Sequence, residues 1–137
     1  MRLAIALEYD GRDFCGFQSQ PSGCGVQDAL ERALNEIAQR ELKAVAAGRT
    51  DAGVHATSQV VHADVADDRP LTAWVRGVNA HLPSTAAVLW AQPVAGSFHA
   101  RHSAEARRYH YSILDRRLRP ALERHRVCWV RQPHDAE

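Results

Sequence analysis

The chain has 137 residues, of which 45% are hydrophobic and 24% are charged. This composition is typical of a globular protein, and the chain is long enough to form one domain with a core. No apolar run approaches the length that crosses a bilayer, and the apolar stretch 3–7 is too short for a secretory signal. We therefore expect a soluble, cytoplasmic protein without membrane contacts.

The net charge of +1 conceals an asymmetry along the chain. Residues 1–100 carry 8 basic and 11 acidic side chains, whereas residues 101–137 carry 9 arginines and 5 acids. Arginine binds phosphate through a planar fork and stacks on bases, so the later segment suits nucleic acid. A solvated arginine-rich surface is the alternative explanation, and charge alone leaves both open.

The first elements are an apolar run, a loop and an amphipathic pattern. The run 3–7 ends at Tyr9-Asp10-Gly11 and predicts a strand that meets a turn. Residues 11–25 contain four glycines and one proline, which predict a loop. Apolar residues then recur with a helical period over 26–38, so this segment is predicted to be an amphipathic helix: Val26, Ala29, Leu30, Ala33, Leu34, Ile37 and Ala38.

Three further apolar segments and a second helical stripe follow. Residues 43–47 and 58–65 predict two strands, the second with Val61, Ala63 and Val65 on one face. Pro70 begins a predicted helix, and 86–91 is another apolar strand; the helix stripe consists of Leu71, Trp74, Val75 and Val78. The order β-α-β-β-α-β is that of ferredoxin-like domains. We therefore predict an α+β fold, a ferredoxin-like (RRM-like) βαββαβ domain with an antiparallel sheet, over residues 1–95.

The remaining residues, 96–137, predict the start of a second unit. Residues 107–114 alternate as a fifth strand would, and the apolar patch 127–130 predicts another strand. No helical pattern follows that could cover these two strands. We expect them to be the first strands of a second, incomplete ferredoxin-like unit.

The cysteines and histidines show no metal-binding spacing. Cys15, Cys24 and Cys128 are odd in number and lack CxxC spacing, which argues against a disulfide framework and against zinc. We expect buried or idle thiols. The eight histidines are scattered without an HExxH motif, so a metal site has little support and we expect none.

The segment 47–56 is a polar loop bracketed by glycines, and it places Arg49 two residues before Asp51. Loops between apolar strands often present catalytic groups on a rigid scaffold. Aspartate and glycine also dominate ordinary turns, so a structural turn is the alternative for Asp51.

Aromatic residues are interleaved with arginines in two later segments, 98–102 and 107–111. This composition is typical of single-stranded nucleic-acid platforms, where bases stack and phosphates pair. For Tyr109, a half-buried aromatic on a strand is the alternative.

Taken together, the motifs resemble those of the tRNA pseudouridine synthase A family along essentially the whole chain. The matching segments are 8–11, Phe14, 16–20, 26–27, 47–55, 59–62, 77–80, 82–83, 98–101 and 106–109. The resemblance implies an isomerase that flips a uridine of the tRNA anticodon stem-loop (positions 38–40) out of its stack and converts it to pseudouridine without a cofactor. It further implies a homodimer at full length.

The resemblance also implies a role for three residues. Asp51 matches the nucleophile. Arg49 matches the arginine that keeps this aspartate ionised and helps to hold the RNA, and Tyr109 matches the tyrosine that packs against the target base. Members of the family are about twice as long, so we expect this chain to be an N-terminal portion that is inactive alone. A non-catalytic RNA-binding ferredoxin-like module is the alternative function.

Overall fold

The computed structural model describes residues 1–131, and the chain divides into two compact units between Glu105 and Ala106. The first unit contains strands β1 (Arg2–Tyr9), β2 (Val45–Ala46), β3 (Ala56–Asp64) and β4 (Ala86–Val94), and helices α1 (Val26–Ala38) and α2 (Val78–His81). A 3₁₀ turn, η1 (Gly11–Asp13), follows β1, and a π-helical turn, η2 (Ala73–Gly77), runs directly into α2. Within the described residues no helix is long and apolar enough to cross a membrane.

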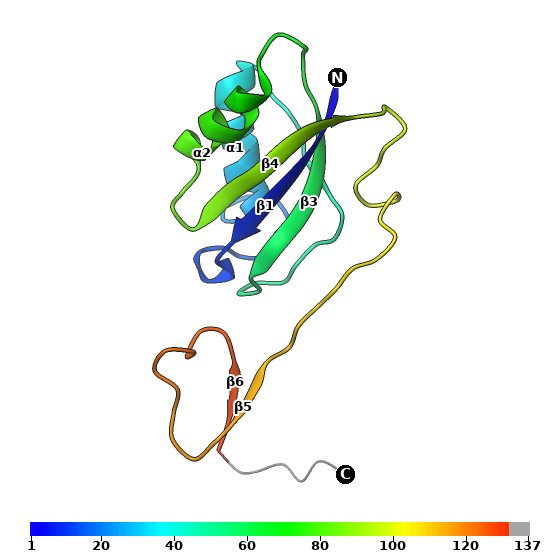
Figure 1. The fold of residues 1–137 in the computed structure, drawn as a ribbon. Coiled ribbons are helices and arrows are strands. Elements are labelled where there is room, and N and C mark those ends of the chain that lie inside the picture. The colour runs from blue at the N-terminus through cyan, green and yellow to red at the C-terminus, as the bar shows by residue number, and fades with distance from the viewer. Residues whose placement is uncertain (132–137) are drawn as a thin grey trace. The chain divides into compact units, whose positions relative to one another are not determined.

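The four strands form one sheet in the order β2-β3-β1-β4. All neighbouring strands are antiparallel, with β1 paired to β3 on one side and to β4 on the other. Both helices lie on the same side of this sheet (Figure 1). This arrangement confirms the predicted α+β, ferredoxin-like fold with an antiparallel sheet.

Alternation along β1 builds the core. Leu3, Ile5 and Leu7 are fully buried beneath the helices, where they join Leu30 and Leu34 of α1. The bounds of α1 agree with the amphipathic pattern predicted over 26–38. The helix therefore forms because its apolar stripe meets the inward-facing residues of the central strand.

The second helical segment agrees only partly with its predicted stripe. Residues 71–81 are helical, and Trp74 and Val78 are buried as expected. Leu71 is instead exposed. Leu71 lies at the start of the helical segment, before η2, whereas Trp74 and Val78 lie within η2 and at the start of α2.

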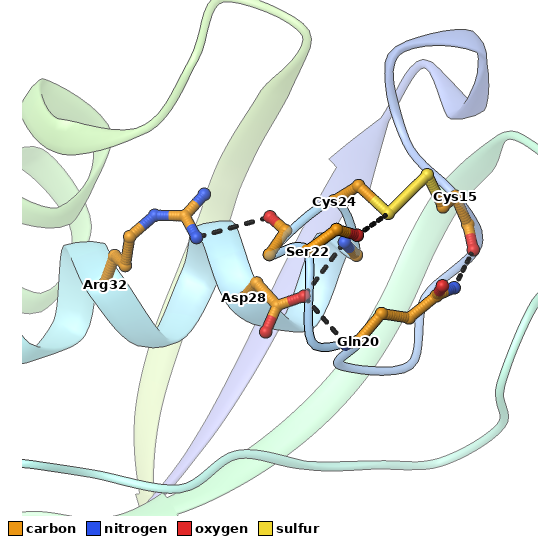
Figure 2. Close-up of a disulfide and its surroundings, with 8 residues drawn as sticks. Cys15, Gln20, Ser22, Cys24, Asp28 and Arg32 are labelled. Carbon is orange, nitrogen blue, oxygen red and sulfur yellow. Dashed lines mark hydrogen bonds between the residues drawn. A yellow bond between two sulfur atoms is a disulfide. The ribbon is translucent and has the colours of Figure 1, made fainter.

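The loop between β1 and α1 contains a disulfide between Cys15 and Cys24, so the prediction of buried or idle thiols is wrong for this pair (Figure 2). Their Cα atoms lie 5.3 Å apart, and the N–H of Cys15 donates to the carbonyl of Cys24 at 2.9 Å. Asp28 of α1 accepts from the N–H groups of Gly25 and Gln20, at 2.9 and 3.1 Å. An odd cysteine count still allows one local pair where a glycine-rich loop doubles back.

The second unit contains two short parallel strands, β5 (Ile113–Asp115) and β6 (Cys128–Val130). Strand β6 confirms the prediction for 127–130 apart from its first residue. The predicted strand 107–114 is wrong over 107–112, which is irregular. Alternation alone does not make a strand, because a strand also needs a neighbour to accept its backbone hydrogen bonds. In this stretch Tyr109 is 71% exposed.

The first compact unit extends beyond residue 95, where the sequence analysis placed its end. The side chain of His62 on β3 explains the extension, because its Nδ1 accepts the N–H of the buried Ala100 at 3.0 Å. Burial lowers the pKa of His62, and the nearby Arg2 lowers it further. The division of the chain into domains 1–95 and 96–137 stays a prediction.

Candidate active site

Asp51 lies in the loop that connects β2 to β3, and its side chain is exposed. The N–H of Val54 donates to the carbonyl of Asp51 at 3.1 Å, which closes a four-residue turn. Gly53, the third residue of this turn, has φ of +83°. A type II turn requires a positive φ at this position, which glycine adopts at little cost. The turn therefore fixes the backbone of Asp51 and leaves its carboxylate in solvent.

Two buried polar side chains, one on β1 and one on β3, hydrogen-bond to the residues just before Asp51. The hydroxyl of Tyr9, at the end of β1, lies 2.6 Å from Oγ1 of Thr50. Nε2 of Gln59, on β3, donates to the carbonyl of Gly48 at 2.6 Å. Tyr9 is 4% exposed and Gln59 is 8% exposed. These contacts fix the backbone immediately before Asp51.

Backbone groups of the segment that follows β1 also hydrogen-bond to the loop. The N–H of Phe17 donates to the carbonyl of Thr50 at 2.9 Å. The N–H of Gly11 donates to Nδ1 of His55 at 3.0 Å, and Gly11 also packs against the backbone of Val54. Phe17 is itself buried in the core. The loop is thus anchored at both ends to the central strand and its continuation.

The charged groups around the loop are mostly paired with other residues. Arg49 is exposed, and its Nη1 donates to Oε1 of Gln18 at 3.3 Å. Over the described part of the chain no ion pair joins Arg49 to Asp51. Hydrogen bonds from Arg12 hold the pKa of Asp10 well below its ordinary value. Asp51 therefore stands as an exposed carboxylate beside side chains that have other partners.

The three residues singled out by sequence lie in two units. Asp51 and Arg49 share one loop of the first unit, whereas Tyr109 belongs to the second. Tyr109 lies in an irregular, exposed stretch. The expected packing of Tyr109 against a flipped base stays a prediction, as does the action of Arg49 on Asp51.

The sequence analysis did not identify Tyr9, Thr50 and Gln59 as residues that support the site. One signal was present in the pattern of β3. Gln59 shares the inward face with Val61, Ala63 and Val65, so it is a polar residue on an apolar face. A buried amide needs hydrogen-bond partners, and here the Asp51 loop supplies one of them.

Among residues 1–131 no group of three His, Cys, Asp or Glu side chains is arranged to hold a metal ion.

The family model described as tRNA pseudouridine synthase matches residues 5–103, which include most of the sheet, both helices and the Asp51 loop. The chain belongs to the tRNA pseudouridine synthase family. It is 58% identical to tRNA pseudouridine synthase A of Dechloromonas aromatica over its whole length, which corresponds to 52% of that relative. It is 55% identical to the protein of the same name from Thiobacillus denitrificans over 98% of the chain, again 52% of the relative.

A third relative, tRNA pseudouridine synthase A of Verminephrobacter eiseniae, is 54% identical over 99% of the chain and 51% of its own length. The chain thus spans about half the length of the curated relatives it matches. The family match places the Asp51 loop inside the shared region, while Tyr109 lies beyond residue 103, where the match ends.

Proposed function

We propose that this chain supplies the nucleophile-bearing half of a tRNA pseudouridine synthase, an isomerase that converts uridine to pseudouridine in the tRNA anticodon stem-loop. One observation carries the proposal. Within the region of the family match, Asp51 presents an exposed carboxylate on a loop that is held by hydrogen bonds from Tyr9, Phe17 and Gln59. A turn that only reversed the direction of the chain would not need hydrogen bonds with side chains and backbone groups of three other residues.

The reaction breaks the N1–C1′ bond of uridine and forms a C5–C1′ bond, while C5 loses a proton and N1 gains one. No group donor or redox partner is consumed. The target atoms are shielded in the base stack, so the nucleotide must first be flipped out. Asp51 then acts as the covalent nucleophile that splits this rearrangement into two steps.

Two other residues complete the proposed site. Tyr109 offers an aromatic face on which the flipped uracil packs, and Arg49 pairs with Asp51 and holds the RNA backbone once the tRNA is bound. The described part of the second unit carries eight arginines and two carboxylates, a balance that suits contact with phosphates. The active form is a cytoplasmic homodimer of a chain about twice this length, and it works without a metal.

The test uses tRNA that carries tritium at uridine C5, since formation of the new bond releases this tritium to water. Residues 1–137 are assayed alone and joined to the part of the Dechloromonas aromatica relative that this chain does not cover. We expect the fusion to release tritium, Asp51→Asn to abolish release, and the 137-residue chain alone to be inactive. If Asp51→Asn retained release, Asp51 would not be the nucleophile.

The same assay distinguishes the enzyme from the alternative function. A non-catalytic RNA-binding module predicts that the fusion binds tRNA and releases no tritium. Release by the 137-residue chain alone would instead refute the requirement for the other half.

A further inference from the structure

We infer that Tyr9 and Gln59 are positioning residues for Asp51, forming a buried polar clamp beneath the loop that carries it. The inference rests on the proposed role of Asp51 as nucleophile. The polar clamp consists of the side chains of Tyr9 and Gln59 together with their hydrogen-bond partners, the carbonyl of Gly48 and the hydroxyl of Thr50.

The amide of Gln59 has a defined orientation in the polar clamp. The carbonyl of Gly48 can only accept, so the nitrogen end of the Gln59 amide must face it, at 2.6 Å. The same nitrogen has a second proton and lies 3.4 Å from the hydroxyl of Tyr9. The Tyr9 hydroxyl also shares a hydrogen bond with the hydroxyl of Thr50, whose Oγ1 is 2.6 Å away and in which either oxygen can donate. One chain of hydrogen bonds thus runs from β3 through the end of β1 to the residue before Asp51.

Burial makes this arrangement strongly preferred over its alternatives. Tyr9 and Gln59 are both almost completely buried, so a hydroxyl or amide that lost its partner could not turn to water instead. The ring of Tyr9 is itself held at centroid distances of 6.3 Å from both Phe14 and Phe17. The position of the hydroxyl that bonds Thr50 is therefore fixed by the core, and the loop must fit this position.

The polar clamp restrains a group of the loop that the other hydrogen bonds do not reach. The turn bond from Val54 fixes the carbonyl of Asp51, and Phe17 fixes the carbonyl of Thr50. The side chain of Thr50 is held by Tyr9. Because Thr50 precedes Asp51 directly, a shift of the Thr50 backbone would redirect the carboxylate, and the bond to the Thr50 side chain resists this shift. A misplacement of about 1 Å at a reacting group can cost about a hundredfold in rate, so this restraint is worth maintaining for catalysis.

A first experiment needs no catalysis and uses the 137-residue chain. Amide hydrogen exchange is followed by NMR in the parent and in Tyr9→Phe, which removes only the hydroxyl. We expect the amides of Val54 and Phe17 to exchange about tenfold faster in the variant, because the bonds they make to the loop open more often. The amide of Ile5 in the core of β1 should be unchanged, which shows that the fold persists.

A matched control removes a comparable hydrogen bond elsewhere. Oδ1 of Asn35 on α1 accepts the N–H of Leu42 at 2.7 Å. Asn35→Ala should accelerate exchange at Leu42 and leave Val54 as in the parent. Should Tyr9→Phe also expose Ile5 to exchange, Thr50→Val removes the same bond from the loop side and decides the question. Unchanged exchange at Val54 in a folded variant would overturn the inference.

A second experiment measures single-turnover tritium release by the fusion enzyme. We expect Tyr9→Phe and Gln59→Met to lower the rate about 10- to 100-fold while tRNA affinity stays within about twofold. Thr50→Ser keeps the hydroxyl and should retain the rate, whereas Thr50→Val should lose it. The double variant Tyr9→Phe with Thr50→Val should be no slower than either single one, since both break the same bond.

The two experiments separate the possible failures. A fusion that binds tRNA and releases no tritium counts against the proposed function, while hydrogen exchange still tests whether the polar clamp orders the loop. Full rates in Tyr9→Phe and Gln59→Met, in a fusion that needs Asp51, would overturn the positioning role alone.

Discussion

Gly11 lies directly against the backbone carbonyl of Val54, with no space between them for a Cβ atom. The same glycine donates its N–H to Nδ1 of His55 at 3.0 Å. The turn after β1 and the loop that carries Asp51 therefore fit together through a residue without a side chain. This close approach ties the position of Asp51 to the end of the central strand.

A methyl group at position 11 should force these two segments apart. We expect Gly11→Ala to lower the free energy of unfolding by about 1–3 kcal/mol, the usual cost of overpacking. Gly96 is a matched control, because a Cβ there meets nothing within 4 Å. Gly96→Ala should stay within about 0.5 kcal/mol of the parent. Urea denaturation of the 137-residue chain measures both, and equal stability of the two variants would contradict the close approach.

Gly53 tests backbone conformation rather than space. Its φ is +83°, and a Cβ there also meets nothing within 4 Å. We expect Gly53→Ala to lower the free energy of unfolding by about 1 kcal/mol through strain alone, and Gly53→Asn to lower it less, since asparagine tolerates this region. The same denaturation measurement applies. An alanine variant as stable as the parent would show that the turn is not type II.

The disulfide makes the stability of the chain depend on reduction. Cys15 and Cys24 are 9 positions apart in the sequence. A crosslink over so short a loop contributes roughly 2–3 kcal/mol, so a reducing agent should lower the free energy of unfolding by this amount. The variant with serine at both positions should not respond to the reducing agent, and Cys128→Ser should respond like the parent.

Thiol titration checks the same disulfide independently. The denatured, unreduced chain should contain one reactive thiol, that of Cys128, and three after reduction. Three reactive thiols before reduction would show that the pair is not bonded.

His62 makes the stability depend on pH. Burial and then Arg2 lower its pKa in the folded state from the ordinary 6.5, so the unfolded chain binds more protons below that pH. This contribution to stability is complete above about pH 6.5 and is lost as the pH falls through the lowered pKa. His62→Asn keeps an acceptor for the Ala100 N–H and does not titrate. We expect the free energy of unfolding of this variant to decrease less between pH 6.5 and 4.5.

His99 is the control for this measurement. Its ring centroid lies 4.7 Å from that of His62, and its pKa is also lowered, by desolvation first and then by His102. The variant His99→Asn should retain the part of the pH dependence that belongs to His62. Parallel pH profiles for the parent and His62→Asn would contradict the assignment.

The sequence predicted what depends on periodicity. The strand at 3–7, the helix at 26–38 and the order β-α-β-β-α-β all appear in the structure, because each apolar pattern has one face to bury. The sequence pattern did not predict the exposure of Leu71 or the irregular stretch 107–112. In the first case the residue lies at the start of the helical segment, ahead of the buried part of the stripe. In the second, the alternating pattern pairs with no strand among residues 1–131.

By itself, the sequence determined the ferredoxin-like fold and drew attention to Asp51, since glycine-bracketed polar loops are local features. Only the tertiary structure decided what holds Asp51 in place: Tyr9 is far from it in the sequence, and it meets Gln59 and the loop through the packing of β1 beside β3. The tertiary structure likewise paired Cys15 with Cys24 and gave Arg49 a hydrogen bond to Gln18. Periodicity is a property of neighbouring residues, whereas the partner of a side chain depends on which distant segments the core brings together.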